Sequence, residues 1–168
     1  GTGQADDSIT LTNSSAVTGN VALGSDNDTF NLSTGINSAT AVTGTLSFET
    51  GTSDTLSYQG NAGPITVAIN TNTGGTATTA YASYVTGIVS GFEYIVGSDY
   101  ASPTSSSAVG DEIYDNTGAS LVVLTGSNTG TVNDVDFSSV ENLQLRSGAD
   151  TLSFQGTSDS PGLIDGLV

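Results

Sequence analysis

The chain has 168 residues, of which 35% are hydrophobic and only 11% charged, a balance that favours short strands and tight turns over long helices. The chain has seventeen acidic residues and a single cationic one, Arg146. This balance excludes nucleic-acid binding, because that function needs clustered Lys and Arg. The chain has no Cys for disulfides or thiolate metal sites, and no apolar run approaches the roughly 18 residues of a membrane span. It also contains no Met, so we expect a processed product or part of a longer protein.

In chain order, the first predicted elements are copies of one short motif: Asp, a small polar residue, then alternating apolar and polar positions. The copies are residues 7–11, 28–32, 54–58 and 150–154. Each places two large apolar residues on one face of a short strand and polar residues on the other. We therefore predict a strand at each copy, with apolar pairs such as Leu56/Tyr58 and Leu152/Phe154 filling the interior.

Further strands are predicted between these copies, bounded mostly by Gly or Pro, at residues 17–23, 42–48, 65–69, 84–89 and 120–125. A second motif, with Glu93 and Glu141 at matching places before an aliphatic strand, occurs at residues 91–99 and 140–145.

Two segments low in large apolar residues, 70–80 and 98–110, are predicted loops. The second loop divides the chain into an N-terminal half, residues 1–97, and a C-terminal half, residues 111–168. We expect the two halves to form one continuous module.

Repetition of one Asp-led strand predicts an all-β fold, and within that class a β-solenoid of the parallel β-helix or β-roll kind. Stacked rungs place equivalent turns above one another, whereas a sandwich has no reason to repeat the motif. The alternative fold is an antiparallel β-sandwich that polymerises by strand exchange at its termini.

Four linked segments carry a resemblance to a known family. Residues 54–69 and 124–131, the latter continuing through 135–143 into 148–152, resemble recurring units of giant bacterial surface adhesins of the filamentous-haemagglutinin-like and RTX-like kinds. The resemblance spans roughly residues 54–154. It implies secretion to the cell surface, tandem repetition and a role in attachment or architecture rather than catalysis.

Calcium is the cofactor that the resemblance implies, since RTX repeats bind it through Asp carboxylates between stacked turns. The turns at residues 1–7 and 24–30 come nearest to that nonapeptide, but neither matches it fully. The alternative, which the sequence favours at any single site, is that each Asp caps its own turn by accepting backbone N–H bonds. The candidate calcium ligands are Asp6, Asp7, Asp26, Asp28, Asp54 and Asp150.

An enzyme would have to rely on carboxylates, because the chain has no His, Cys or Lys. The sequence gives no reason to pair any two of the candidates across a cleft, so we predict no catalytic residues. These carboxylates are Glu93, Asp111, Glu112, Asp134, Asp136 and Glu141.

A cluster of aromatic residues could instead form a sugar-binding platform or fill the core; its members are Tyr81, Tyr84, Phe92, Tyr94 and Tyr100.

The sequence therefore predicts a structural, calcium-linked subunit of an extracellular fibre or adhesin whose main partner is another copy of itself, joined end to end. Glycans are a further expected partner, and membrane insertion is not expected. The alternative function is a carbohydrate-binding or carbohydrate-degrading β-helix module.

Overall fold

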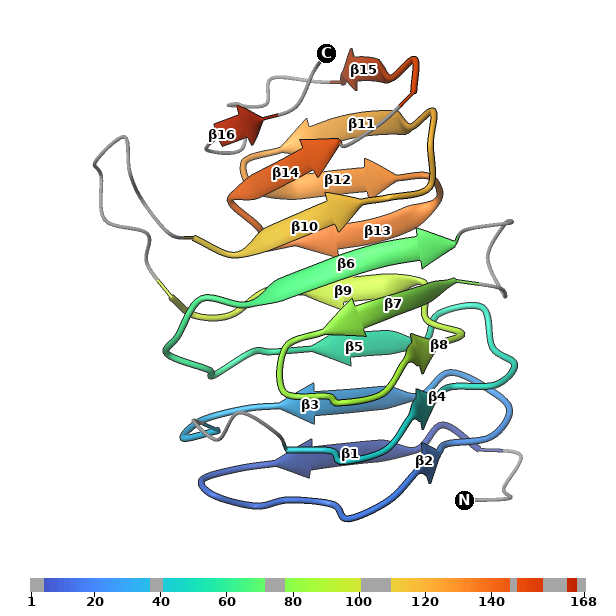
Figure 1. Cartoon of the computed structure of the whole chain (residues 1–168), viewed down its shortest axis with the longest axis vertical. Helices are drawn as coiled ribbons and strands as arrows, with labels where there is room; N and C mark the ends of the chain where they lie inside the picture. Colours follow the sequence, from blue (N-terminus) through green and yellow to red (C-terminus); the bar gives the residue numbers. More distant parts are fainter. Residues whose placement is uncertain are drawn as a thin grey trace.

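The computed structural model describes residues 5–36, 41–71, 78–100, 110–145, 148–155 and 163–165. These residues form sixteen strands and no helix, arranged as two facing sheets (Figure 1). The all-β class predicted from the sequence is therefore confirmed. In the described part of the chain, no helix is long and apolar enough to cross a membrane.

Each sheet has eight strands. The first has the order β1-β3-β5-β9-β13-β12-β11-β15. Its strands, in chain order, are β1 (Ser8–Leu11), β3 (Thr29–Leu32), β5 (Thr55–Ser57), β9 (Tyr94–Val96), β11 (Leu121–Gly126), β12 (Thr129–Val132), β13 (Val135–Ser138) and β15 (Thr151–Phe154). The second has the order β16-β14-β10-β6-β7-β8-β4-β2. Its strands are β2 (Val21–Ala22), β4 (Leu46–Ser47), β6 (Thr66–Thr71), β7 (Thr79–Ala82), β8 (Val89–Ser90), β10 (Glu112–Asp115), β14 (Asn142–Leu145) and β16 (Leu163–Asp165).

The chain alternates between the two sheets and returns to each beside an earlier strand, in parallel register. It departs from this alternation twice, where β6-β7-β8 and β11-β12-β13 each stay in one sheet and pair antiparallel. Both sheets are consequently mixed, and a purely antiparallel sandwich does not describe them. At one end of the stack lie β1 and β2, and at the other β15 and β16 (Figure 1).

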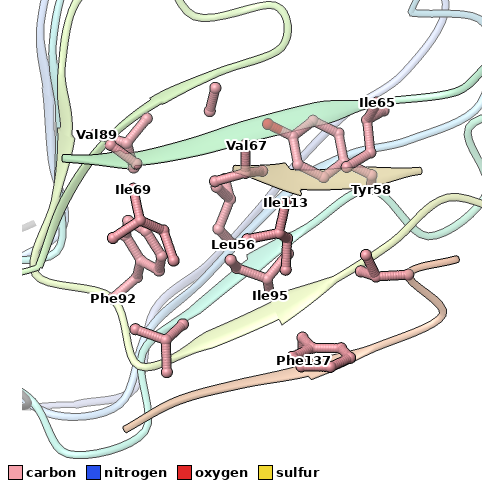
Figure 2. Close-up of a cluster of buried hydrophobic side chains, with 14 of the residues drawn as sticks. Leu56, Tyr58, Ile65, Val67, Ile69, Val89, Phe92, Ile95, Ile113 and Phe137 are labelled. Carbon is pink, nitrogen blue, oxygen red and sulfur yellow. The ribbon is translucent and has the colours of Figure 1, made fainter. Parts of the chain in front are cut away.

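The hydrophobic core lies between the sheets. Every second residue of a strand points to the same face of its sheet, and the apolar residues are on the face that looks toward the other sheet. Leu56 and Ile95 reach into it from the first sheet, and Val67, Ile69 and Ile113 from the second (Figure 2). All five are at most 1% exposed. In-register pairing stacks these side chains in continuous rows, so truncating one to Ala would cost about 2–5 kcal/mol.

The second antiparallel excursion depends on a two-residue turn. Asn133 and Asp134 connect β12 to β13 with φ of 47° and 66°, the left-handed conformation that a type I′ turn requires. The Asn133 side chain holds the hairpin in place, since its Nδ2 donates to Asp115 Oδ2 (2.7 Å) and its Oδ1 accepts the Leu121 N–H (2.8 Å).

All four Asp-led segments form strands as predicted, namely β1, β3, β5 and β15. The sequence interpretation missed β7, β10, β12, β13 and β16, and β7 begins inside the predicted loop 70–80. Strands such as β12, with Gly and Thr, have little pattern of their own and exist because both neighbours pair with them. Most of the predicted loop 98–110, namely residues 101–109, lies outside the described residues.

One predicted interior pair is correct and the other is not. Leu56 and Tyr58 are fully buried. Leu152 is only half-buried and Phe154 is 57% exposed. The physical reason is position: β15 is the outermost described strand of the first sheet, so no further rung covers its inward face.

Candidate functional site

Carboxylates stand immediately before successive parallel strands of the first sheet and bond to one another's backbone. Asp28 Oδ1 accepts the N–H of Asp7 (2.7 Å), and Asp54 Oδ1 accepts the N–H of Asp28 (2.7 Å). Glu93 Oε2 in turn accepts the N–H of Asp54 (2.9 Å). The Asp28 and Asp54 carboxylates therefore satisfy the backbone of the neighbouring rung, not that of their own turns as the capping interpretation predicted.

The same bond recurs in the second sheet and at the far end of the first. Asp111 Oδ1 accepts the Ile65 N–H, and Glu141 Oε2 accepts the Asp111 N–H, both at 2.9 Å. Asp150 Oδ1 accepts the Ser120 N–H, also at 2.9 Å. We call these six contacts among the described residues the carboxylate relay: the residue before one strand donates its N–H to the carboxylate before the next parallel strand.

The relay explains why Glu93 and Glu141 recur at matching places in the sequence. Glu93 accepts the Asp54 N–H, and the β6-β7-β8 excursion lies between these two residues in the chain. Glu141 accepts the Asp111 N–H, and the β11-β12-β13 excursion lies between them. In the first case the bonded strands β5 and β9 belong to the first sheet and the excursion to the second. In the second case the bonded strands β10 and β14 belong to the second sheet and the excursion to the first. In both cases the accepting carboxylate stands where the chain returns to a sheet after an excursion.

Several relay carboxylates are only half satisfied. Asp28 and Asp54 are fully buried and Glu93 is 8% exposed, yet Asp28 Oδ2, Asp54 Oδ2 and Glu93 Oε1 have no hydrogen-bond partner. Burial raises the pKa of Asp54 to about 6, against the lowering effect of the Asp28 N–H and with help from the Glu93 and Asp28 charges. Burial likewise raises the pKa of Glu93.

In the second sheet, burial raises the pKa values of Asp111 and Glu141, opposed by the N–H groups that their carboxylates accept. Asp111 also accepts bonds from the N–H and hydroxyl of Ser98. The relay therefore holds carboxylates in a setting that favours a proton or another cation.

The structure does not gather the six predicted calcium ligands into one site. Asp7, Asp28, Asp54 and Asp150 belong to the relay, while Asp6 Oδ1 accepts the Asn27 N–H instead. Asp26 lies in a turn with φ of 83°. The described residues contain no group of three or more carboxylates that could hold a metal ion. The unpartnered carboxylate oxygens are ligands of the kind that calcium takes in proteins.

The carboxylates considered for catalysis are likewise tied into structure. Asp111 and Glu141 serve the relay, and Asp134 forms the β12–β13 turn. Asp136 lies on β13 beside Tyr94, accepts its hydroxyl and so raises the Tyr94 pKa. The last candidate, Glu112, stands half-buried on β10.

The aromatic residues do not form one platform. Phe92 is buried against Phe48, with ring centroids 6.5 Å apart. Tyr84 packs on Tyr58 at 6.3 Å. Tyr81 and Tyr94 are exposed on different sheets.

Sequence reasoning missed a shallow groove of about 220 Å³ on the first sheet. Tyr94, Asp136, Thr125 and Thr131 are among its lining residues. No short motif signals it, because its walls come from separate strands.

Comparisons with protein-family models, curated proteins and solved structures found no match for this chain. Its function must therefore be inferred from its own geometry.

Proposed function

We propose that this chain is a structural subunit of an extracellular fibre or surface adhesin, a β-solenoid module that assembles end to end with copies of itself. The observation that carries the proposal is that the core continues to both ends of the stack and is uncovered there. The extracellular location rests on the resemblance to surface adhesins.

At the first end, Ile9 occupies the row that continues through Phe30 and Leu56. Those two partners are fully buried, but Ile9 is 36% exposed. At the other end, Phe154 pairs with the fully buried Leu124 and is 57% exposed. Both side chains stand at core positions, and a further rung on either end would bury them.

The partner that fits both ends is another copy of the chain. When two copies stack, the last strands of one cover the first strands of the next, so both exposed ends are buried by a single contact. The outermost strands also have unpaired backbone N–H and C=O groups that can form a parallel pair. Assembly of this kind proceeds head to tail and gives an open filament. The strongly acidic surface, with a net charge of −16, limits side-by-side association of the same molecules.

Electron microscopy of the purified chain tests this proposal. Each sheet has eight strands, and strands about 4.8 Å apart give an axial repeat of about 38 Å per copy. Filaments with that repeat are expected. Isolated monomers at all concentrations would refute the proposal. Repeating the experiment with calcium and with a chelator shows whether calcium, which we propose as a weak ligand, contributes to assembly.

Two isoleucines of similar exposure provide a matched pair of variants. Ile9→Lys places a charge at the end of the stack and is expected to abolish filaments. Ile88, which is 42% exposed, immediately precedes β8 in the interior of the second sheet, so Ile88→Lys should leave them intact. Equal loss in both variants would mean that general surface polarity, and not the end contact, controls assembly.

Carbohydrate binding is the second candidate function, and the groove beside Tyr94 favours it. An exposed aromatic ring next to a carboxylate and Thr hydroxyls can stack on a sugar ring and accept its hydroxyl protons. Binding of oligosaccharides that is lost in Tyr94→Ala but kept in Tyr81→Ala, an exposed Tyr on the other sheet, would support this candidate.

A further inference from the structure

We infer that successive copies join by parallel pairing of β15 with β1 in one defined register, in which the Asp150 N–H donates to the Asp7 carboxylate of the next copy. The inference rests on the proposed end-to-end assembly and names its contact. It makes the junction a seventh member of the carboxylate relay.

The relay has a constant direction. In all six contacts the donor N–H precedes one strand, and the accepting carboxylate precedes a parallel strand later in the chain. Asp150 accepts from Ser120, and its own N–H stands at the next donor position, at the outer edge of β15. Asp7 donates its N–H to Asp28, and its carboxylate stands at the first acceptor position, at the outer edge of β1. One end therefore presents a donor and the other an acceptor.

The register that joins them also matches the two faces of the strands. Leu152 lies opposite Ile9, and Phe154 opposite Leu11, so the uncovered core positions of both ends bury one another. On the outward face, Ser153 lies opposite Thr10. Every inward residue meets an inward residue, as in the parallel pairs within the chain.

The chain path agrees with this order of strands. Successive strands alternate between the sheets, and β15 lies in the first sheet while β16 lies in the second. The next strand in that alternation belongs to the first sheet, which is where β1 of the following copy is placed. The same register serves separate chains or copies that follow one another in one polypeptide.

A second register is geometrically conceivable, and the relay argues against it. Pairing within the first sheet sets one outward row across all eight strands. This row consists of Ser8, Thr29, Thr55, Tyr94, Asp136, Thr131, Val123 and Ser153. Continuing it straight into the next copy would place Ser153 opposite Ser8, two residues from the inferred register. Leu152 would then face Asp7, which sets an apolar side chain against a carboxylate and leaves the Asp150 N–H without its acceptor.

Disulfide cross-linking of filaments distinguishes the two registers, and the chain has no Cys of its own to interfere. In the inferred register, Ser153→Cys and Thr10→Cys place Cα atoms about 5 Å apart across the junction, within reach of a disulfide. The matched pair Ser153→Cys and Ser8→Cys would stand about 8 Å apart, beyond that reach. Mild oxidation should therefore give a covalent ladder of multimers with the first pair only.

Each other outcome overturns the inference in a recognisable way. Cross-linking of the second pair alone would establish the shifted register. Filaments in which neither pair reacts would exclude the β15–β1 contact while leaving end-to-end assembly in place. Absence of filaments in the unmodified chain would remove the proposed function itself.

The relay bond is tested separately at Asp7, whose backbone N–H, not its side chain, bonds to Asp28 within the chain. Asp7→Ala removes the acceptor at the junction and should raise the concentration needed for filament formation about tenfold. Asp7→Asn loses the same charge but keeps an acceptor oxygen, so it should assemble close to the unmodified chain. Equal assembly of Asp7→Ala and the unmodified chain, with unchanged stability of the monomer, would overturn the role of this bond.

Discussion

Replacing Asp54 by Asn should stabilise the protein at pH 8 and change little near pH 4. The Asp54 side chain is fully buried, its Oδ1 accepts the Asp28 N–H at 2.7 Å, and its Oδ2 has no partner. Asn keeps an acceptor oxygen for that N–H but carries no charge. The substitution therefore removes the cost of burying a carboxylate while retaining the contact between rungs.

The sign and size of the effect follow from the pKa of Asp54, which burial raises from 3.8 to about 6. A folded-state pKa above the unfolded one means that the folded protein binds the proton more tightly. This contribution to stability is complete below about pH 4 and is lost as the pH rises through 6. The full shift corresponds to about 3 kcal/mol, and the weaker bond that a neutral amide oxygen accepts from the Asp28 N–H reduces the expected effect to about 1–2 kcal/mol.

Urea unfolding of the unmodified chain and of Asp54→Asn, at pH values from 4 to 8, measures this difference directly. The unmodified chain should lose stability as the pH rises from 5 to 7, and the variant should lose less. Asp99→Asn, at an exposed position, controls for the general effect of removing one charge from an acidic protein. A variant less stable than the unmodified chain at pH 8 would refute the reasoning, and dependence of that loss on calcium would identify Asp54 as a calcium ligand.

Two further substitutions test the packing. Gly97→Ala should destabilise the fold by about 2 kcal/mol or more, because the added Cβ would lie 1.9 Å from the Ser139 carbonyl oxygen. Gly63→Ala, where the nearest atoms are 3.6 Å away, should be close to neutral in the same thermal unfolding measurement. Tyr58→Phe should cost about 1 kcal/mol in urea unfolding, since the buried hydroxyl donates to the Ser83 carbonyl at 3.1 Å and the ring stays in place. No measurable cost would mean that this bond contributes nothing.

The elements that the sequence predicted well are those whose local pattern is complete. In the Asp-led segment at residues 54–58, alternation alone assigns Leu56 and Tyr58 to the interior, and both are buried. The carboxylate relay was not predictable in this way, because Asp54 and Glu93 are 39 residues apart. Only the stacking of β5 on β9 brings them into contact.

The sequence by itself determined the all-β class, the four Asp-led strands and the positions of the acidic residues at strand starts, because each depends on neighbours within a few residues. Tertiary structure decided which strands pair, that β12 is a strand at all, and that Phe154 is exposed although its pattern matches that of a core residue. The physical reason is that the burial and pairing of a strand depend on the strands that lie on either side of it in its sheet. For the outermost strands, β1 and β15, that neighbour is not supplied by the described part of the chain.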